Sequence, residues 1–131
     1  MKLLTKVISA ATLALAVGVS YASPAKLITH NQTNVESNAI IGGHASAHPT
    51  NPNKDRAVPW TLVRLACYGY VVNNKCSAVI RMGTNTSHPV DVGTATVDLD
   101  SGYITFIYAD EKNSDYVVTV NGPGETTITK K

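Results

Sequence analysis

The sequence predicts an all-β protein, a small antiparallel β-sandwich or small barrel of about six or seven strands, preceded by a flexible N-terminal arm. Three observations predict this fold. Beyond Trp60, apolar residues recur at every second position, which is the period of a strand with one buried face. Turn-forming residues separate these alternating runs at short intervals. Beyond residue 22, no window shows the 3.6-residue period of an amphipathic helix.

The first element, residues 1–22, has the form of a secretory signal peptide. Two lysines precede an apolar run over residues 7–19. Ser20 and Ala22 are small residues of the kind that a signal peptidase accepts before its cleavage site. The apolar run is shorter than the roughly 20 residues that span a bilayer. We therefore expect cleavage after Ala22 and a protein that is secreted or periplasmic.

The charge balance of the mature chain excludes two kinds of partner. Lys2 and Lys6 leave with the signal peptide, so nine basic and nine acidic residues remain. Without a net charge, the mature chain has no electrostatic attraction to nucleic acid or to anionic lipid, and we expect neither as a partner. Later apolar stretches, such as residues 104–109, have the length of strands, which predicts no integral membrane segment in the mature chain.

Residues 23–57 are predicted to form the flexible arm. This segment contains no aromatic residue and is rich in Asn, Ser, Thr, His and Pro. Such a composition buries too little apolar surface to offset the entropy lost on ordering. Only residues 38–41 are expected to dock on the domain, which should comprise residues 58–131.

Within residues 58–131, alternation of apolar and polar side chains marks strands, most clearly over residues 75–82 and 116–121. Between Val90 and Leu99 the apolar positions change parity near Gly93, which predicts a β-bulge at that glycine. Glycine, asparagine and aspartate predict the turns between strands. These turns are at residues 73–74, 83–85, 100–102, 110–114 and 121–124.

Cys67 and Cys76 are the only two cysteines, and a lone pair in an exported protein is expected to form a disulfide bond. A two-residue hairpin turn at Asn73-Asn74 would place Cys67 opposite Ile80. That position is four residues along the strand from Cys76, beyond the ~7 Å limit between bonded α-carbons. Two alternatives remain: a tight hairpin with buried free thiols, or a disulfide with a broader loop over residues 68–75.

No group of residues has the pattern of a catalytic or metal centre. His44 and His48 are four residues apart, but the glycines and proline around them make a metal-binding helix improbable, and we interpret them and His30 as solvated. Asp98 and Asp100 flank a Ser-Gly turn, so we interpret them as turn-forming residues and not as a glycosidase pair. We expect a protein that is not an enzyme, with no catalytic residues, no metal and no cofactor.

Tyr68, Tyr70 and Arg81 are the candidate binding residues. On the tight-hairpin alternative, both tyrosines project from one face of the sheet beside Arg81. Tyrosine and arginine on one face form the kind of surface that is enriched at binding hot spots. The other interpretation is that the tyrosines pack in the core of the sandwich.

In its layout of a signal peptide followed by one small β domain, the chain resembles the small secreted β-rich proteins of Gram-negative bacteria that have no assigned activity. The resemblance implies an exported binding protein of the envelope or secretome, whose partner is a protein or glycan outside the cytosol. The layout is also similar to that of periplasmic inhibitors of hydrolases such as lysozyme, which often carry one disulfide. In that alternative, Ser101-Gly102-Tyr103 would be the inhibitory loop.

Overall fold

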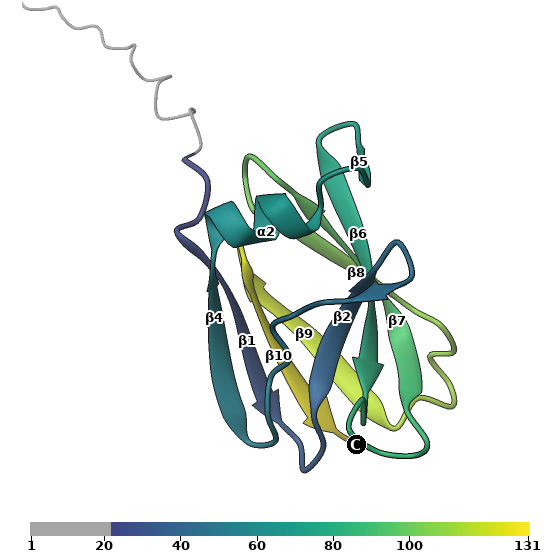
Figure 1. Cartoon of the computed structure of the whole chain (residues 1–131). Coiled ribbons are helices and arrows are strands. Elements are labelled where there is room, and N and C mark those ends of the chain that lie inside the picture. Colours follow the sequence, from purple (N-terminus) through teal and green to yellow (C-terminus); the bar gives the residue numbers. More distant parts are fainter. Residues whose placement is uncertain (1–21) are drawn as a thin grey trace, which may run out of the picture.

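Two β-sheets face each other across a shared interior in the computed structural model, which describes residues 22–131 (Figure 1). The predicted signal peptide, apart from Ala22, lies outside the described residues. The smaller sheet has the strand order β4-β1-β10-β9. Its strands are β1 (Lys26–Gln32), β4 (Lys54–Pro59), β9 (Tyr116–Gly122) and β10 (Glu125–Lys130).

The larger sheet has the order β3-β2-β6-β7-β8, and a short strand, β5, pairs with β6. Its strands are β2 (Ser37–Ile41), β3 (His44–Ala45), β5 (Val71–Val72), β6 (Lys75–Met82), β7 (Val90–Asp98) and β8 (Ile104–Tyr108). The prediction of a small all-β sandwich is confirmed. The described residues form ten strands, more than the predicted six or seven, because β1 to β4 arise from the segment predicted to be flexible.

The prediction of a flexible arm over residues 23–57 is wrong, and so is the domain start at residue 58. β1 is a central strand of the smaller sheet: it pairs antiparallel with β4 and parallel with β10. β2 pairs with β6 in the larger sheet. The segment therefore contributes strands to both layers of the sandwich.

Asn31 shows how so polar a segment becomes ordered. Its side chain is 1% exposed, and Nδ2 donates to the carbonyl oxygens of Val35, Thr50 and Asn51 at 2.8, 3.2 and 3.2 Å. Its Oδ1 accepts hydrogen bonds from the backbone N–H and the hydroxyl of Thr33. Hydrogen bonds to the backbone replace apolar burial here, which composition alone does not reveal.

One helix, α2 (Trp60–Ala66), occurs among residues 22–131, and the sequence did not predict it because seven residues are too few to establish a helical period. It connects β4 of the smaller sheet to β5 of the larger one and lies at one end of the sandwich (Figure 1). Trp60 and Val63 are its buried residues. No helix in the described part of the chain has the length and apolarity needed to cross a membrane.

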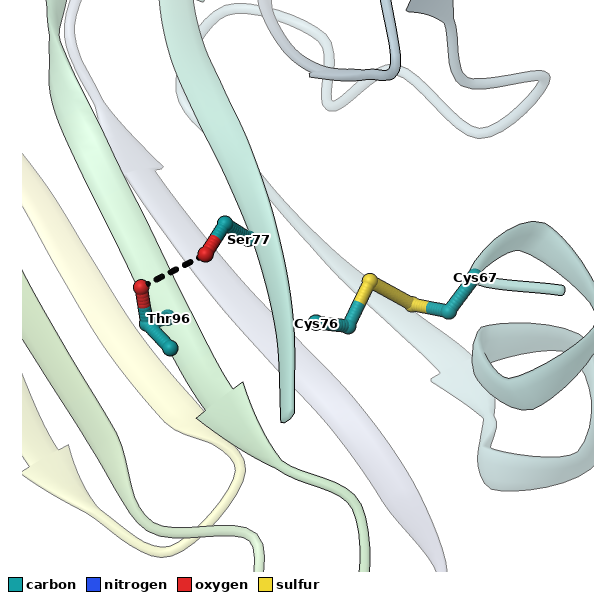
Figure 2. The surroundings of a disulfide bond; sticks show 4 residues. All are labelled: Cys67, Cys76, Ser77 and Thr96. Carbon is teal, nitrogen blue, oxygen red and sulfur yellow. Dashed lines mark hydrogen bonds between the residues drawn. A yellow bond between two sulfur atoms is a disulfide. The ribbon is translucent and has the colours of Figure 1, made fainter. Parts of the chain in front are cut away.

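The hairpin and the disulfide, treated as alternatives from the sequence, both form. Val71 pairs with Cys76, and Asn73 and Asn74 take φ values of 51° and 63°, as a two-residue hairpin turn of type I′ requires. Cys67 and Cys76 are bonded, with their α-carbons 5.9 Å apart. They can bond because Cys67 ends α2 and is not on a strand, and Figure 2 shows the bridge from the helix end to β6.

Two buried clusters lie at opposite ends of β6. The first surrounds the disulfide and comprises Trp60, Val63, Cys67, Cys76 and Leu99. The second comprises Met82, Val92, Tyr116 and Ile128. Between them, Ile80 pairs with Gly93 and Arg81 with Asp91, so Val92 is the extra residue of a bulge. The bulge predicted near Gly93 is confirmed.

Candidate binding surface

Exposed large apolar side chains are concentrated on α2, on β5 and in the segment between them. We call this concentration the α2–β5 surface, and its members are Leu62, Leu65, Tyr68, Tyr70, Val71 and Val72. These six side chains lie within eleven consecutive positions and are more than half of the ten large apolar side chains exposed in the described part of the chain. Single exposed apolar residues are normal, whereas a concentration of them is a candidate interaction site.

The local sequence exposes this surface because α2 buries only one face. Trp60, Val63 and Cys67 recur at intervals of three and four residues and pack in the core, whereas Leu62 and Leu65 lie on the outer face, Leu65 with 69% of its surface exposed. Tyr68 follows the helix with 83% of its surface exposed. The disulfide holds this segment against β6 and so limits the entropy that a partner must remove on binding.

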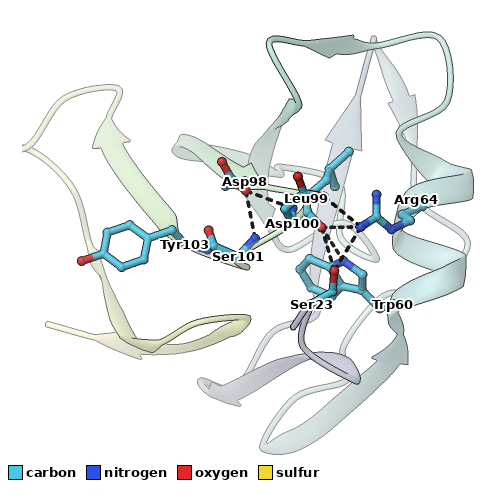
Figure 3. Close-up of polar contacts among 8 residues, drawn as sticks. All are labelled: Ser23, Trp60, Arg64, Asp98, Leu99, Asp100, Ser101 and Tyr103. Carbon is cyan, nitrogen blue, oxygen red and sulfur yellow. Dashed lines mark hydrogen bonds and ion pairs between the residues drawn. The ribbon is translucent and has the colours of Figure 1, made fainter. Parts of the chain in front are cut away.

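Hydrogen bonds hold α2 against the turn that follows β7. The indole Nε1 of Trp60 donates to the carbonyl oxygen of Leu99 at 2.9 Å, and Nη2 of Arg64 donates to the same oxygen at 2.7 Å. Arg64 also pairs with Asp100 at 3.5 Å. Figure 3 shows these side chains converging on Leu99. These contacts fix the position of α2 relative to the turn after β7.

A groove of about 280 Å³ runs between α2 and the hairpin of β2 and β3. Tyr70 lies in this groove with its ring centroid 6.4 Å from that of His44. A Cβ atom on Gly42 would overlap the Tyr70 ring, so the glycine permits this packing. His48, Leu62 and Leu65 also line the groove, and no Lys, Arg, Asp or Glu is among its lining residues in the described structure. The groove is suited to an apolar or aromatic group.

The structure brings two of the three candidate binding residues together. Tyr68 and Tyr70 both lie on the α2–β5 surface, and neither packs in the core. Arg81 is five residues from Cys76 on β6, which is about 16 Å along the strand. It pairs with Asp91 through an Nε–Oδ1 contact of 2.5 Å, which lowers the pKa of that carboxyl. The predicted Tyr68, Tyr70 and Arg81 face is wrong, because both tyrosines lie in the loop before β5 and not in the sheet.

The alternative loop, Ser101-Gly102-Tyr103, forms a turn built by Asp98. One carboxylate oxygen of Asp98 accepts hydrogen bonds from the backbone N–H groups of Asp100 and Ser101, each at 2.9 Å. These bonds lower the pKa of Asp98. Tyr103 is 69% exposed, and its ring points away from the turn (Figure 3). The turn-forming interpretation of Asp98 is confirmed.

The comparisons with known proteins agree with this fold. A family model described as the type II secretion system (T2SS) substrate NttC matches residues 1–131. The chain belongs to the NttC family. A crystal structure of the Legionella pneumophila type II secretion system substrate NttC superposes with a TM-score of 0.76 and 46% sequence identity. The match covers 83% of this chain and 100% of that one. A comparison with curated proteins found no match.

The layout of the sequence indicates only a general resemblance to small secreted β-rich proteins, and the NttC family is the particular family to which the chain belongs. NttC is described as a type II secretion substrate, which supports the expectation of an exported protein. A secretion substrate is defined by its route of export, which identifies no ligand and no partner. The functional assignment of this NttC-family chain therefore depends on its own surface and interior.

The interpretation of His30 as a solvated linker residue is wrong for this NttC-family chain. His30 lies on β1, with Nδ1 2.8 Å from an oxygen of Asp55 and Nε2 2.7 Å from an oxygen of Glu125. The hydrogen bond to Glu125 raises the pKa of His30 most, and the hydrogen bond to Asp55 raises it further. No sequence pattern indicated this cluster, because it depends on the pairing of β1 with β4 and β10. Residues 22–131 contain no group of three or more His, Cys, Asp or Glu side chains arranged to hold a metal ion.

Proposed function

We propose that this chain is an exported, non-enzymatic binding protein that engages a protein partner outside the cytosol through the α2–β5 surface. The export step is supported by the NttC family model, which matches the chain over residues 1–131. The observation that carries the binding role is the concentration of exposed large apolar side chains on α2 and β5. The surface is anchored by a disulfide, which lowers the conformational entropy that binding would cost.

The composition of the surface favours a protein over a glycan. Its aliphatic members, Leu62, Leu65, Val71 and Val72, have no polar group with which to recognise sugar hydroxyls. Tyr68 and Tyr70 provide the aromatic side chains that are enriched at the centres of protein interfaces. The partner should therefore present an apolar or aromatic side chain to the groove beside Tyr70.

A pair of matched variants tests this proposal. Leu65→Ser combined with Tyr68→Ala removes two exposed side chains from the α2–β5 surface, whereas Tyr103→Ala removes a tyrosine elsewhere that is 69% exposed. Each protein is first measured in the culture medium and the periplasm to establish that it is exported. The unmodified protein and the two variants are then crosslinked to the proteins and glycans present in the periplasm and the culture medium. Mass spectrometry quantifies what each of them captures.

We expect the double variant to lose one specific protein partner, with binding weakened about tenfold or more, and Tyr103→Ala to retain it. Equal binding by all three proteins contradicts the role of the surface. Loss of a glycan in place of a protein contradicts the class of partner.

A second candidate function, inhibition of a hydrolase such as lysozyme, is favoured by the turn at Ser101-Gly102-Tyr103. Asp98 holds this turn with two backbone hydrogen bonds, and Tyr103 projects from it, as an inserting residue must. The same variants separate the two functions in a lysozyme assay. Inhibition that Tyr103→Ala abolishes and the Leu65, Tyr68 double variant retains would support the inhibitor. No inhibition by the unmodified protein rejects it for lysozyme.

A further inference from the structure

The interior between the two sheets contains a cavity of about 110 Å³. It lies between the disulfide cluster and the Met82 cluster, and both sheets contribute to its walls. Ala78 of β6 and Ala95 of β7 are directly paired, and both line the cavity, as does Ala39 of β2. Two sheets of a sandwich are normally filled by large interdigitating side chains. Three alanines on neighbouring strands leave that space empty.

The opposite wall of the cavity comes from the smaller sheet, where Thr29, Val118 and Thr126 are among the lining residues. Most of the lining side chains are apolar. The alanines of the larger sheet are half-buried and not fully buried. Apolar cavities of this size class stay dry and accept apolar guests: an engineered cavity of about 150 Å³ binds benzene.

Arg56 is a cationic residue on the strand next to β1, and it is not itself among the residues that line the cavity. Arg56 of β4 is paired with Thr29, and residues directly opposite each other in an antiparallel pair share one face of the sheet. Because Thr29 lines the cavity, Arg56 faces the interior as well, from an edge strand. The Nε of Arg56 is buried and has no hydrogen-bond partner. Within residues 22–131, no other buried side-chain nitrogen or oxygen lacks a hydrogen-bond partner.

An unpaired buried donor on a charged group is costly, and native proteins almost always satisfy such donors. A guanidinium is best satisfied by a planar anion that accepts two parallel hydrogen bonds, which is the geometry of a carboxylate. The neighbouring cavity requires an apolar group on the same molecule. Together the two features describe an alkyl chain that ends in a carboxylate.

We propose that the space between the sheets is a binding site for a free fatty acid, with the end of the alkyl chain in the alanine-lined cavity and the carboxylate paired with Arg56. The site lies inside the sandwich and is separate from the α2–β5 surface. The fatty acid would be held without forming a covalent bond to the protein.

Titration of the full-length secreted protein with sodium decanoate, followed by calorimetry, tests this site. The uncharged analogue 1-decanol tests the carboxylate. Arg56→Gln removes the cation, and Lys54→Gln removes a neighbouring cation of the same strand and is the matched control. Ala95→Leu fills the cavity, with Ala78→Val as a smaller replacement on the paired strand. Near-ultraviolet circular dichroism of the buried Trp60 establishes that each variant is folded.

We expect saturable binding of decanoate with one site, weakened about tenfold or more by Arg56→Gln and unchanged by Lys54→Gln. The folded cavity-filling variants should bind neither decanoate nor 1-decanol. The proposal is overturned if the unmodified protein does not bind decanoate or if the folded cavity-filling variants bind it normally. Equal weakening by the Arg56 and Lys54 variants, or binding of 1-decanol as tight as that of decanoate, removes the role of Arg56 and with it the proposed ligand.

Discussion

His30 of β1 and Glu125 of β10 lie 2.7 Å apart, from Nε2 to Oε2, although they are 95 residues apart in the sequence. The contact joins the two strands of the described sandwich that pair in parallel. Asp55 of β4 approaches the other ring nitrogen at 2.8 Å, so one imidazole spans three strands. Both nitrogens can donate to the carboxylates only when the ring is protonated.

The stability of the fold should therefore depend on pH through His30. Its pKa in the folded state is raised above the ordinary value of 6.5. The folded state thus binds the proton more tightly than the unfolded state, and the stabilisation is fully present below pH 6.5. It is lost as the pH rises through the raised pKa. Urea unfolding from about pH 5 to about pH 9 measures this loss.

His30→Gln should abolish that pH-dependent part of the free energy of unfolding, and His88→Gln, on an exposed loop, should leave it unchanged. If the His30→Gln variant shows the same pH profile as the unmodified protein, the dependence originates from another group.

Reduction of the Cys67–Cys76 bond should lower the free energy of unfolding by about 2–3 kcal/mol, because the bond closes a short loop in the unfolded chain. Urea unfolding with and without reductant measures the change, and intact mass shows the gain of two hydrogens. The segment carrying Tyr68 and Tyr70 should also lose its fixed position, so partner binding should weaken in parallel. A fully reduced protein with an unchanged unfolding midpoint would refute this account.

Asn31→Asp should destabilise the fold by about 3 kcal/mol or more, although the two side chains have the same shape. The substitution removes the Nδ2 donor to three carbonyl oxygens and places a carboxylate in a site that is 1% exposed. The exposed Asn85→Asp is the control and should change stability by no more than about 0.5 kcal/mol. Equal effects of the two variants would show that the Asn31 hydrogen bonds do not order the segment between β1 and β4.

Gly93→Ala should destabilise the protein by about 1–3 kcal/mol through overpacking. A Cβ atom at this position would overlap the carbonyl oxygen of Ile107 and lie 2.7 Å from the ring of Phe106, so β8 would have to move. Gly122→Ala is the matched control, because a Cβ there meets no atom within 4 Å. Thermal unfolding compares the stability of the two variants. A Gly93→Ala protein as stable as the Gly122→Ala protein would contradict the close approach of β7 and β8.

The strands and turns after Trp60 were predictable because they follow from local patterns. Alternation of apolar residues indicated β6 and β9, and paired asparagines indicated the turn at residues 73–74. The parity change near Gly93 indicated the bulge, since each added residue reverses the face of those that follow.

The strands before Trp60 were not predictable, because their order depends on distant contacts. β1 is held by β10, and the polar segment around it is satisfied by the Asn31 side chain. The candidate binding surface was predicted in part: Tyr68 and Tyr70 were named because a tight hairpin would place them on one face of the sheet, but their neighbours Leu62 and Leu65 were not named. They require knowledge that α2 exists and which of its faces is buried.

The pairing of β1 with β10 also orders the assembly of the protein in time. An exported chain crosses the membrane with its N-terminal end first, so β1 emerges long before the strand that completes its sheet. The smaller sheet cannot close until residues 125–130 are present. The disulfide joins positions only nine residues apart and can form earlier. Until β10 arrives, β1 lacks its parallel neighbour, so closure of the smaller sheet should be the last step of folding.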